Sequence, residues 1–241
     1  AIVEAMALDL GNLESVKAFA AEANQSLEQI DLLVNNAGIM MTPYSKTTDG
    51  FESQFGVNHL GHFALTGLLL DKVNAAENGR IVNVSSSAHS AGNMDFDNLM
   101  FEDGNYSPLR SYGRSKLANL LFTLELDKRL KATGSDTISV SVHPGVNQTN
   151  LSRHAEERLL GKMMMTLMSF MMMDASQGAL NTLRAAVDPA SKGNEYYGPN
   201  GRGGFSGYPV VLDPSDDAKD ADDAARLWQV SEELTGISFL S

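Results

Sequence analysis

Short apolar runs alternate along the chain with longer stretches in which apolar residues recur at helical spacing. The short runs are rich in β-branched residues, as is typical of buried strands, and cover residues 30–34, 80–84 and 137–142. The longer stretches predict amphipathic helices and cover residues 13–23, 51–74 and 112–131. This alternation predicts an α/β fold with a doubly wound parallel sheet and helices on both faces.

The two ends of the chain follow the same plan less regularly. Residues 1–10 read as a strand that is already under way. Helices are predicted at residues 175–187 and 224–234, and a glycine-rich loop is predicted at residues 198–204. No Pro/Ser-rich linker and no internal repeat interrupts these elements, so residues 1–241 are predicted to form a single domain.

Composition and charge narrow the classes of function. Of the 241 residues, 43% are hydrophobic, which is enough for one sizeable core. The formal net charge of −12 repels phosphate backbones and argues against nucleic acid as a partner. The lack of cysteine excludes a thiol nucleophile and a Cys-based zinc site. The sequence has no visible signal peptide and no run of roughly 20 apolar residues, so we expect a cytoplasmic location.

Small and polar residues follow each predicted strand. They are Asp9-Leu10, Asn35-Asn36-Ala37-Gly38, Ser85-Ser86-Ser87 and His143-Pro144-Gly145. The carboxyl ends of parallel strands lie at one edge of a sheet, where open α/β folds bind their ligands. Gly38 and Gly145 permit close approach of a ligand to the backbone. Four such strand ends together indicate a cofactor-binding crevice.

Tyr112 and Lys116 lie one turn apart on the helix that is predicted to follow the third of these strand ends. A free phenol has a pKa of about 10, which is too high for a base near neutral pH. A neighbouring ammonium favours the phenolate and lowers that pKa, so the pair is suited to proton transfer. The alternative is a surface helix that carries an ordinary Tyr and Lys.

In their order along the chain, these motifs resemble the signature set of the short-chain dehydrogenase/reductase family. The matching motifs are Asn35-Asn36-Ala37-Gly38, Asn58 within a long helix, Ser86, Tyr112-x-x-x-Lys116 and Pro144-Gly145. Residues 55–63, 115–119 and 226–236 resemble the branch that contains retinol dehydrogenases, the WW-domain-containing oxidoreductase and, more distantly, protochlorophyllide reductase. The resemblance runs from residue 1 to about residue 237. It implies a Rossmann-type fold and an NAD(P)-dependent oxidoreductase that acts on CH–OH groups.

The resemblance also implies a role for each site residue. Tyr112 would be the general acid/base, and Lys116 would lower its pKa and bind the nicotinamide ribose. Ser86, which aligns with the family serine, would bind the substrate oxygen, and Asn58 would hold a water that links Lys116 to solvent. The other cofactor-binding residues that it implies are Asp9, Leu10, Asn36, Ala37, Gly38, Pro144, Gly145, Val146 and Thr149.

Several of these residues also have purely structural interpretations. Ser86 would cap a strand end, and Asp9 would cap a helix. His59 and His62 are three residues apart, but no carboxylate or cysteine joins them at ligand spacing, so no metal is expected. The Gly-x-Ser-x-Gly elbow of a serine hydrolase is not present in the sequence.

One family feature has no counterpart in the sequence. The family begins with a strand and a Thr-Gly-x-x-x-Gly-x-Gly turn that holds the pyrophosphate at a helix N-terminus. The glycine-rich run at residues 198–207 opens no helix. By resemblance the first two β-α units are missing, so we expect a fragment that binds cofactor poorly, folds poorly and leaves its first strand without a neighbour. Any targeting segment would lie upstream. The alternative is a non-catalytic scaffold on the same fold.

The resemblance supplies expectations for cofactor, substrate and partners. The branch favours NADP, with NAD as the alternative. The methionine-rich residues 151–173 fall where the family places its substrate lid, and Met suits a surface that repacks around apolar ligands. Ordinary helix core is the alternative for this segment. We expect an apolar, bulky alcohol, aldehyde or ketone as substrate. The family often forms dimers through the Tyr112 helix, so a homodimer is expected by analogy.

Overall fold

The computed structural model describes residues 2–145, 175–201, 204 and 206–240. A five-stranded sheet lies at its centre, and the strands follow their sequence order: β1 (Leu32–Asn35), β2 (Arg80–Val84), β3 (Ile138–Val142), β4 (Tyr196–Pro199) and β5 (Pro209–Leu212). The first four strands are parallel, and β5 is antiparallel to β4. The predicted α/β sheet is therefore confirmed.

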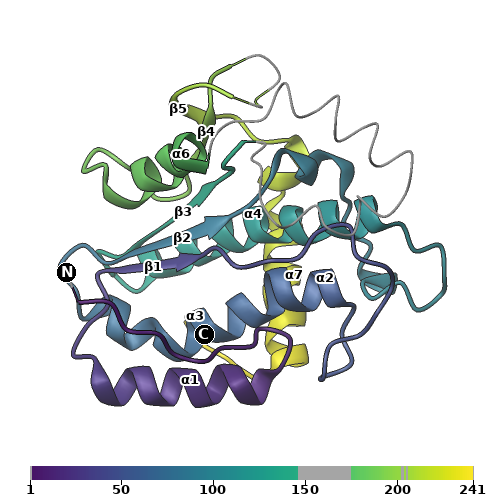
Figure 1. Ribbon diagram of the computed structural model, residues 1–241, viewed down its shortest axis with the longest axis horizontal. Coiled ribbons are helices and arrows are strands. Elements are labelled where there is room, and N and C mark those ends of the chain that lie inside the picture. The colour runs from purple at the N-terminus through teal and green to yellow at the C-terminus, as the bar shows by residue number, and fades with distance from the viewer. Residues whose placement is uncertain (1, 146–174, 202–203, 205, 241) are drawn as a thin grey trace.

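Helices cover both faces of the sheet (Figure 1). The longer ones are α1 (Leu13–Ser26), α3 (Gly61–Asn74), α4 (Pro108–Ala132), α6 (Ala175–Val187) and α7 (Ala221–Thr235). In Figure 1, α6 lies above the sheet and α3 lies below it, while α1 packs against α3 and α7 packs against α4. None of the helices among the described residues combines the length and the apolar character that a membrane span requires.

Alternate residues of β2 face two separate parts of the core. Val82 belongs to the apolar cluster that includes Ala185 of α6. Ile81 belongs to the cluster on the opposite face, together with Phe63 of α3 and Phe122 of α4. Because successive side chains of a strand point to opposite faces, apolar side chains on both faces of β2 are typical of a strand buried on both sides.

Capping residues fix the ends of several helices. Oδ1 of Asn12 accepts hydrogen bonds from the N–H groups of Glu14 and Ser15 and so begins α1. Ser107 caps α4, which has a proline in its first turn. Gly236, with a φ of +67°, ends α7 in the left-handed conformation that glycine adopts without strain.

The helix predicted at residues 51–74 is present but is not uniform. A short helix α2 (Ser53–Phe55) is followed by a π-helical turn, η1 (Gly56–Leu60), which continues into α3. A π turn inserts an extra residue into an α-helix and is often found at functional sites. In this chain the inserted turn contains Asn58.

The central part of α4 is buried on nearly all sides, from Gly113 to Thr123. α7 covers its outer face, where Trp228 stacks on Phe122 with ring centres 5.9 Å apart. The Arg129 guanidinium lies 4.5 Å from the centre of the Trp228 ring, a favourable cation–π distance. A dimer through this part of α4 would have to displace α7, and the homodimer stays a prediction.

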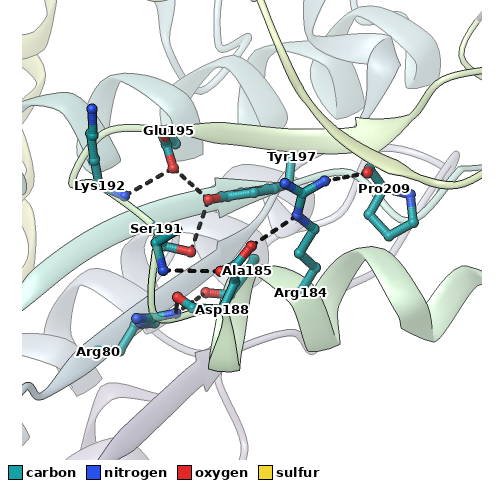
Figure 2. A network of polar contacts seen from close by, with 10 residues as sticks. Arg80, Arg184, Ala185, Asp188, Ser191, Lys192, Glu195, Tyr197 and Pro209 are labelled. Carbon is teal, nitrogen blue, oxygen red and sulfur yellow. Dashed lines mark hydrogen bonds and ion pairs between the residues drawn. The ribbon is translucent and has the colours of Figure 1, made fainter.

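The C-terminal end of α6 is tied to the sheet by polar contacts (Figure 2). Arg80, at the start of β2, donates to the carbonyl oxygens of Ala185 and Asp188 at 2.9 and 3.1 Å. Arg184 donates to the carbonyl oxygen of Pro209 in β5 and pairs with Asp188. Guanidinium groups thus satisfy carbonyls that the helix end leaves free and interact favourably with its dipole.

Two sequence-based predictions about strands are wrong. Residues 2–8 form no strand, because a strand requires a neighbour for its backbone groups and none of the described strands pairs with this stretch. The glycine-rich stretch was predicted as loop from residue 198, but β4 extends to Pro199 and β5 begins at Pro209. These four-residue strands are stabilised by pairing with β3 and with each other rather than by a local pattern.

His59 is a buried imidazole in the aromatic core. Its Nε2 lies 2.9 Å from the hydroxyl oxygen of Ser231, and its ring lies 5.1 Å from Phe55 and 5.9 Å from Phe122. Burial, with a smaller contribution from the nearby His62, lowers the pKa of His59 to about 3. His59 is therefore neutral in the folded protein at neutral pH.

We predict that His59 makes the fold sensitive to acid. The unfolded chain protonates this histidine near pH 6.5, whereas the folded protein does so near pH 3, so stability is lost as the pH falls below 6.5. His59→Phe removes the titrating group and retains an aromatic ring. Between pH 7.5 and pH 5, the unfolding free energy of the parent should fall by roughly 2 kcal/mol relative to the variant. Urea unfolding measures this difference, and a constant difference would contradict the prediction.

Candidate active site

Tyr112 and Lys116 lie on the second and third turns of α4, beside the carboxyl end of β2. Tyr112 is half-buried, and Lys116 is buried with 4% of its surface exposed. Lys116 Nζ lies 5.7 Å from the centre of the Tyr112 ring. The helical spacing read from the sequence therefore places the phenol and the ammonium next to each other.

Burial is the main influence on the pKa of each member of this pair. It raises the pKa of Tyr112, and a hydrogen bond with Ser86 acts in the opposite direction. The ammonium of Lys116 is directed to a backbone carbonyl, and its expected role in lowering the pKa of Tyr112 stays a prediction. Nζ donates to the Val84 oxygen at 3.0 Å. Burial lowers the pKa of Lys116 to about 8, so it remains mostly charged at pH 7.

The carbonyl of Val84, the last residue of β2, accepts a second donor from α4. Asn119 Nδ2 lies 3.1 Å from the same oxygen. The adjacent Ser85 hydroxyl donates back to the carbonyl of Lys116 at 2.7 Å. Sequence reasoning did not single out Asn119 as a site residue, although its position three residues after Lys116 places it on the same helix face.

Asn58 joins the loop after β1 to the Tyr112 helix. Its side-chain amide nitrogen donates to the Ile39 carbonyl and to the Ser115 hydroxyl, both at 2.9 Å. Its oxygen accepts the Ile39 N–H at 2.8 Å. The Ser115 hydroxyl in turn donates to the Tyr112 carbonyl at 2.8 Å. Asn58 thus links β1 to the turn of α4 that carries the phenol.

The backbone carbonyl of Asn58 is also in contact with a side chain. Nδ1 of His62 lies 3.0 Å from this oxygen and therefore carries the hydrogen. Burial lowers the pKa of His62 to about 4, and the charge of Lys116 contributes in the same direction. The contacts of the Asn58 side chain hold the loop after β1 against α4. The water-holding role that the resemblance implies for Asn58 stays a prediction.

Ser86 begins a short 3-10 helix, η2 (Ser87–Ala91), and its hydroxyl accepts the Ala88 N–H at 3.2 Å. The structure gives Ser86 the capping role that is its structural alternative, and hydrogen bonding to Ser86 also lowers the pKa of Tyr112. The neighbouring Ser85 is committed to the Lys116 carbonyl. The cap and the contact with Tyr112 are therefore compatible, and Ser86 stays the predicted substrate-binding serine.

Two of the residues predicted to approach the nucleotide, Gly38 in the loop after β1 and Gly145 in the turn after β3, occupy positions that favour glycine. Asn36 and Ala37 are exposed. A Cβ on Gly38 would lie 2.9 Å from Asn58 Oδ1 and 3.7 Å from Lys116 Nζ, so only glycine fits there without displacing Asn58. Gly145 has a φ of +82°, which also favours glycine.

The remaining predicted cofactor residues lie further from this group or outside it. Asp9 Oδ1 accepts the Gly11 N–H at 2.8 Å within the turn before α1, whereas Asn12 is the residue that caps this helix. Leu10 is buried and packs against Gly61 of α3. Pro144 contributes a carbonyl that lies 3.5 Å from Asn181 Nδ2. Val146 and Thr149 lie outside the described residues, as do the methionines at 163–173.

Within the described part of the chain, no three His, Asp or Glu side chains are grouped so that they could hold a metal ion. His59 and His62, the pair considered from sequence, turn to separate partners, Ser231 and the Asn58 carbonyl.

Comparison with known proteins places these features in a family. Residues 2–159 match the model of the short chain dehydrogenases. The chain is 40% identical to human retinol dehydrogenase 13, with 98% of the chain and 69% of that protein aligned. It is 43% identical to human retinol dehydrogenase 14, with 95% and 66% aligned. The chain therefore spans about two thirds of the length of these curated relatives.

Solved structures show the same likeness. A crystal structure of an uncharacterised protein from Mycobacterium paratuberculosis is 43% identical, with a TM-score of 0.77 over 96% of this chain and 75% of that one. The complex of Pseudomonas aeruginosa RhlG with NADP is 21% identical, with a TM-score of 0.55 over 79% and 73% of the two chains, and shares the fold.

We predict that Asn58 stabilises the site as a clamp. Asn58→Leu keeps the shape and removes three side-chain hydrogen bonds, so the unfolding free energy should fall by roughly 3 kcal/mol. Ser115→Ala removes one of the three partners and should cost about 1 kcal/mol. Because Asn58 and Ser115 share a hydrogen bond, the double variant should lose less unfolding free energy than the two single variants lose together. Urea unfolding of the three variants measures this. Strict additivity would contradict the clamp.

Proposed function

We propose that this chain, which belongs to the short-chain dehydrogenase family of oxidoreductases, carries the proton-transfer half of a nicotinamide-dependent active site that acts on an apolar alcohol or carbonyl. The observation that carries the proposal is the convergence of Ser86, Tyr112 and Lys116 at the carboxyl end of β2. Gly38 borders the same group, because a Cβ there would lie 3.7 Å from Lys116 Nζ. Strand ends of this kind are where open α/β sheets bind ligands.

Tyr112 would move the proton. In reduction its phenol O–H would give a proton to the substrate carbonyl oxygen, and in oxidation the phenolate would take it back. Ser86 would hold the same substrate oxygen by a hydrogen bond while its contact with Tyr112 lowers the phenol pKa. Half-burial of the phenol strengthens both interactions, because the local dielectric is lower than that of water.

Lys116 would act through its charge. Its pKa of about 8 leaves the ammonium protonated at pH 7, and it lies 5.7 Å from the centre of the Tyr112 ring. A positive charge at this position favours the phenolate as the proton leaves. The anchoring of Nζ to the Val84 carbonyl keeps the charge near the phenol and leaves donors for a ribose hydroxyl.

The exposed strand ends would hold the nucleotide. Asn36, Ala37 and Gly38 would lie along the adenosine ribose, with Asp9 and Leu10 towards the adenine. The nicotinamide side would be lined by Pro144, Gly145, Val146 and Thr149. When bound, the nicotinamide supplies or accepts the hydride. We propose NADP rather than NAD from the resemblance to the retinol dehydrogenase branch.

The substrate class is proposed from the relatives. The two human relatives are named for retinol, a bulky apolar alcohol. We therefore propose an apolar alcohol, aldehyde or ketone of similar character. A non-catalytic scaffold on the same fold is the second candidate.

We predict that Tyr112→Phe abolishes most turnover in the longest natural form of the protein. Loss of a general acid/base lowers kcat by about 10²–10⁴-fold, while cofactor affinity should stay near the parent value. The absorbance of the reduced nicotinamide measures the rate. Tyr44→Phe, at an exposed tyrosine, is the matched control and should leave turnover unchanged. Turnover retained in Tyr112→Phe would refute the proposed role.

We predict weak cofactor binding by the 241-residue chain. A phosphate-holding turn at a helix N-terminus supplies much of the affinity for a dinucleotide, and the sequence has no such turn. Titration with NADP and with NAD, followed by calorimetry, should give dissociation constants above the micromolar range for both. Sub-micromolar binding of either cofactor would contradict this prediction.

A further inference from the structure

His89 is a buried imidazole that the proposed reaction does not use. It lies in η2, three residues after Ser86, and only 7% of its surface is exposed. η2 packs directly on the Tyr112 helix, where a Cβ on Gly113 would lie 2.7 Å from the Ala88 carbonyl oxygen. The segment that carries Ser86 and His89 is therefore held close to the residue that follows Tyr112.

The two ring nitrogens of His89 contact different parts of the chain. Nδ1 lies 2.7 Å from the carbonyl oxygen of Ser86, so it must carry the hydrogen and donate. Nε2 accepts the backbone N–H of Ser215 at 3.3 Å, so it must be unprotonated. Both contacts require the same neutral tautomer. The ring thus bridges the end of β2 and the loop before α7.

The surroundings of the ring keep His89 uncharged. His89 meets the ring of Tyr196 edge to face, with centres 5.7 Å apart. Tyr196 also contacts His143, 5.8 Å away, and a positive charge on either histidine would disfavour one on the other. Burial lowers the pKa of His89. The imidazole is therefore a neutral, oriented donor at neutral pH.

Ser86 is held by hydrogen bonds on both sides along the chain. On its N-terminal side, the Ser85 N–H donates to the Val142 carbonyl at 2.7 Å, and the Ser85 hydroxyl donates to the Lys116 carbonyl. On its C-terminal side, the Ser86 carbonyl accepts two donors, the backbone N–H of His89 at 3.0 Å and its ring. The ring contact is the one that extends to a distant segment of the chain.

We propose that His89 is a positioning residue that orients Ser86 so that its hydroxyl meets the Tyr112 phenol. The inference rests on the proposed function, in which Ser86 and Tyr112 share the substrate oxygen. The ring fixes the peptide plane that follows Ser86 and anchors it through Ser215 to the segment that leads into α7. Loss of this anchor leaves the Ser86 peptide held on its C-terminal side only by contacts within η2, so it loosens the hydroxyl whose hydrogen bond lowers the pKa of Tyr112.

The test measures Tyr112 itself, in the 241-residue chain, by ¹³C NMR of labelled tyrosine with Tyr112→Phe to assign the signal. Ser86→Ala is the reference for a lost contact and should raise the pKa of Tyr112 by roughly half a unit or more. His89→Gln loses the donor at Nδ1 and should shift the pKa in the same direction. His89→Asn places an amide near the Nδ1 position and should remain closer to the parent.

Ser215→Pro tests the far end of the bridge without altering the histidine. Ser215 has a φ of −58°, which proline adopts readily, so the substitution removes the N–H that reaches Nε2, together with the serine hydroxyl, without forcing a new backbone conformation at this residue. It should raise the pKa of Tyr112 by a smaller amount than His89→Gln does. If His89→Gln does not fold, Ser215→Pro carries the test alone. Leu130→Ala, in the core at the other end of α4, is the control for general loosening and should leave the pKa unchanged.

The outcomes distinguish a failure of the His89 positioning role from a failure of the proposed function. If Ser86→Ala shifts the pKa of Tyr112 but neither His89→Gln nor Ser215→Pro does, the positioning role of His89 is overturned. If Ser86→Ala has no effect, the Ser86–Tyr112 contact of the proposed function fails instead. If Leu130→Ala shifts the pKa as much as His89→Gln does, the effect is general destabilisation and the proposal is rejected.

Discussion

A buried ammonium that pairs with no carboxylate among the residues the structure describes is the constraint on which the site depends. Lys116 is almost wholly enclosed, and an unpaired charge in such a place is costly. Its cost is reduced by one backbone oxygen, that of Val84, which Asn119 also contacts. Because this oxygen belongs to the last residue of β2, the charge can be satisfied only if α4 is seated on the end of that strand.

This seating brings the other site residues together. Once α4 is fixed on β2, Tyr112 faces the serines that follow the strand, and Ser115 meets Asn58 of the π turn. Asn58 in turn holds the loop after β1 through Ile39. Two strand ends, the π turn and α4 are thus joined by short polar contacts. The π turn contributes to the site because it directs the Asn58 side chain to both the β1 loop and α4.

The outer layers of the fold support the same helix. α7 covers α4 with an aromatic cluster that includes Trp228, and the guanidinium of Arg129 lies over the Trp228 ring. On the opposite face of the sheet, α6 is tied to β2 and β5 by two arginines. The segment that leads into α7 also reaches the site, because Ser215 contacts His89. The C-terminal region therefore contributes to the site although it supplies none of the proposed catalytic residues.

The sequence alone determined the positions of the main helices and of the central strands. The apolar run at residues 80–84 and the helix at residues 175–187 were predicted to the residue, because a strand buried on both faces and an amphipathic helix have strong local patterns. The sequence also placed Tyr112 and Lys116 on one helix face. Only the tertiary structure decided which acceptor Lys116 uses, which tautomer His89 adopts and whether residues 2–8 pair as a strand. Each of these depends on partners far away in the chain, and local periodicity contains no information about them.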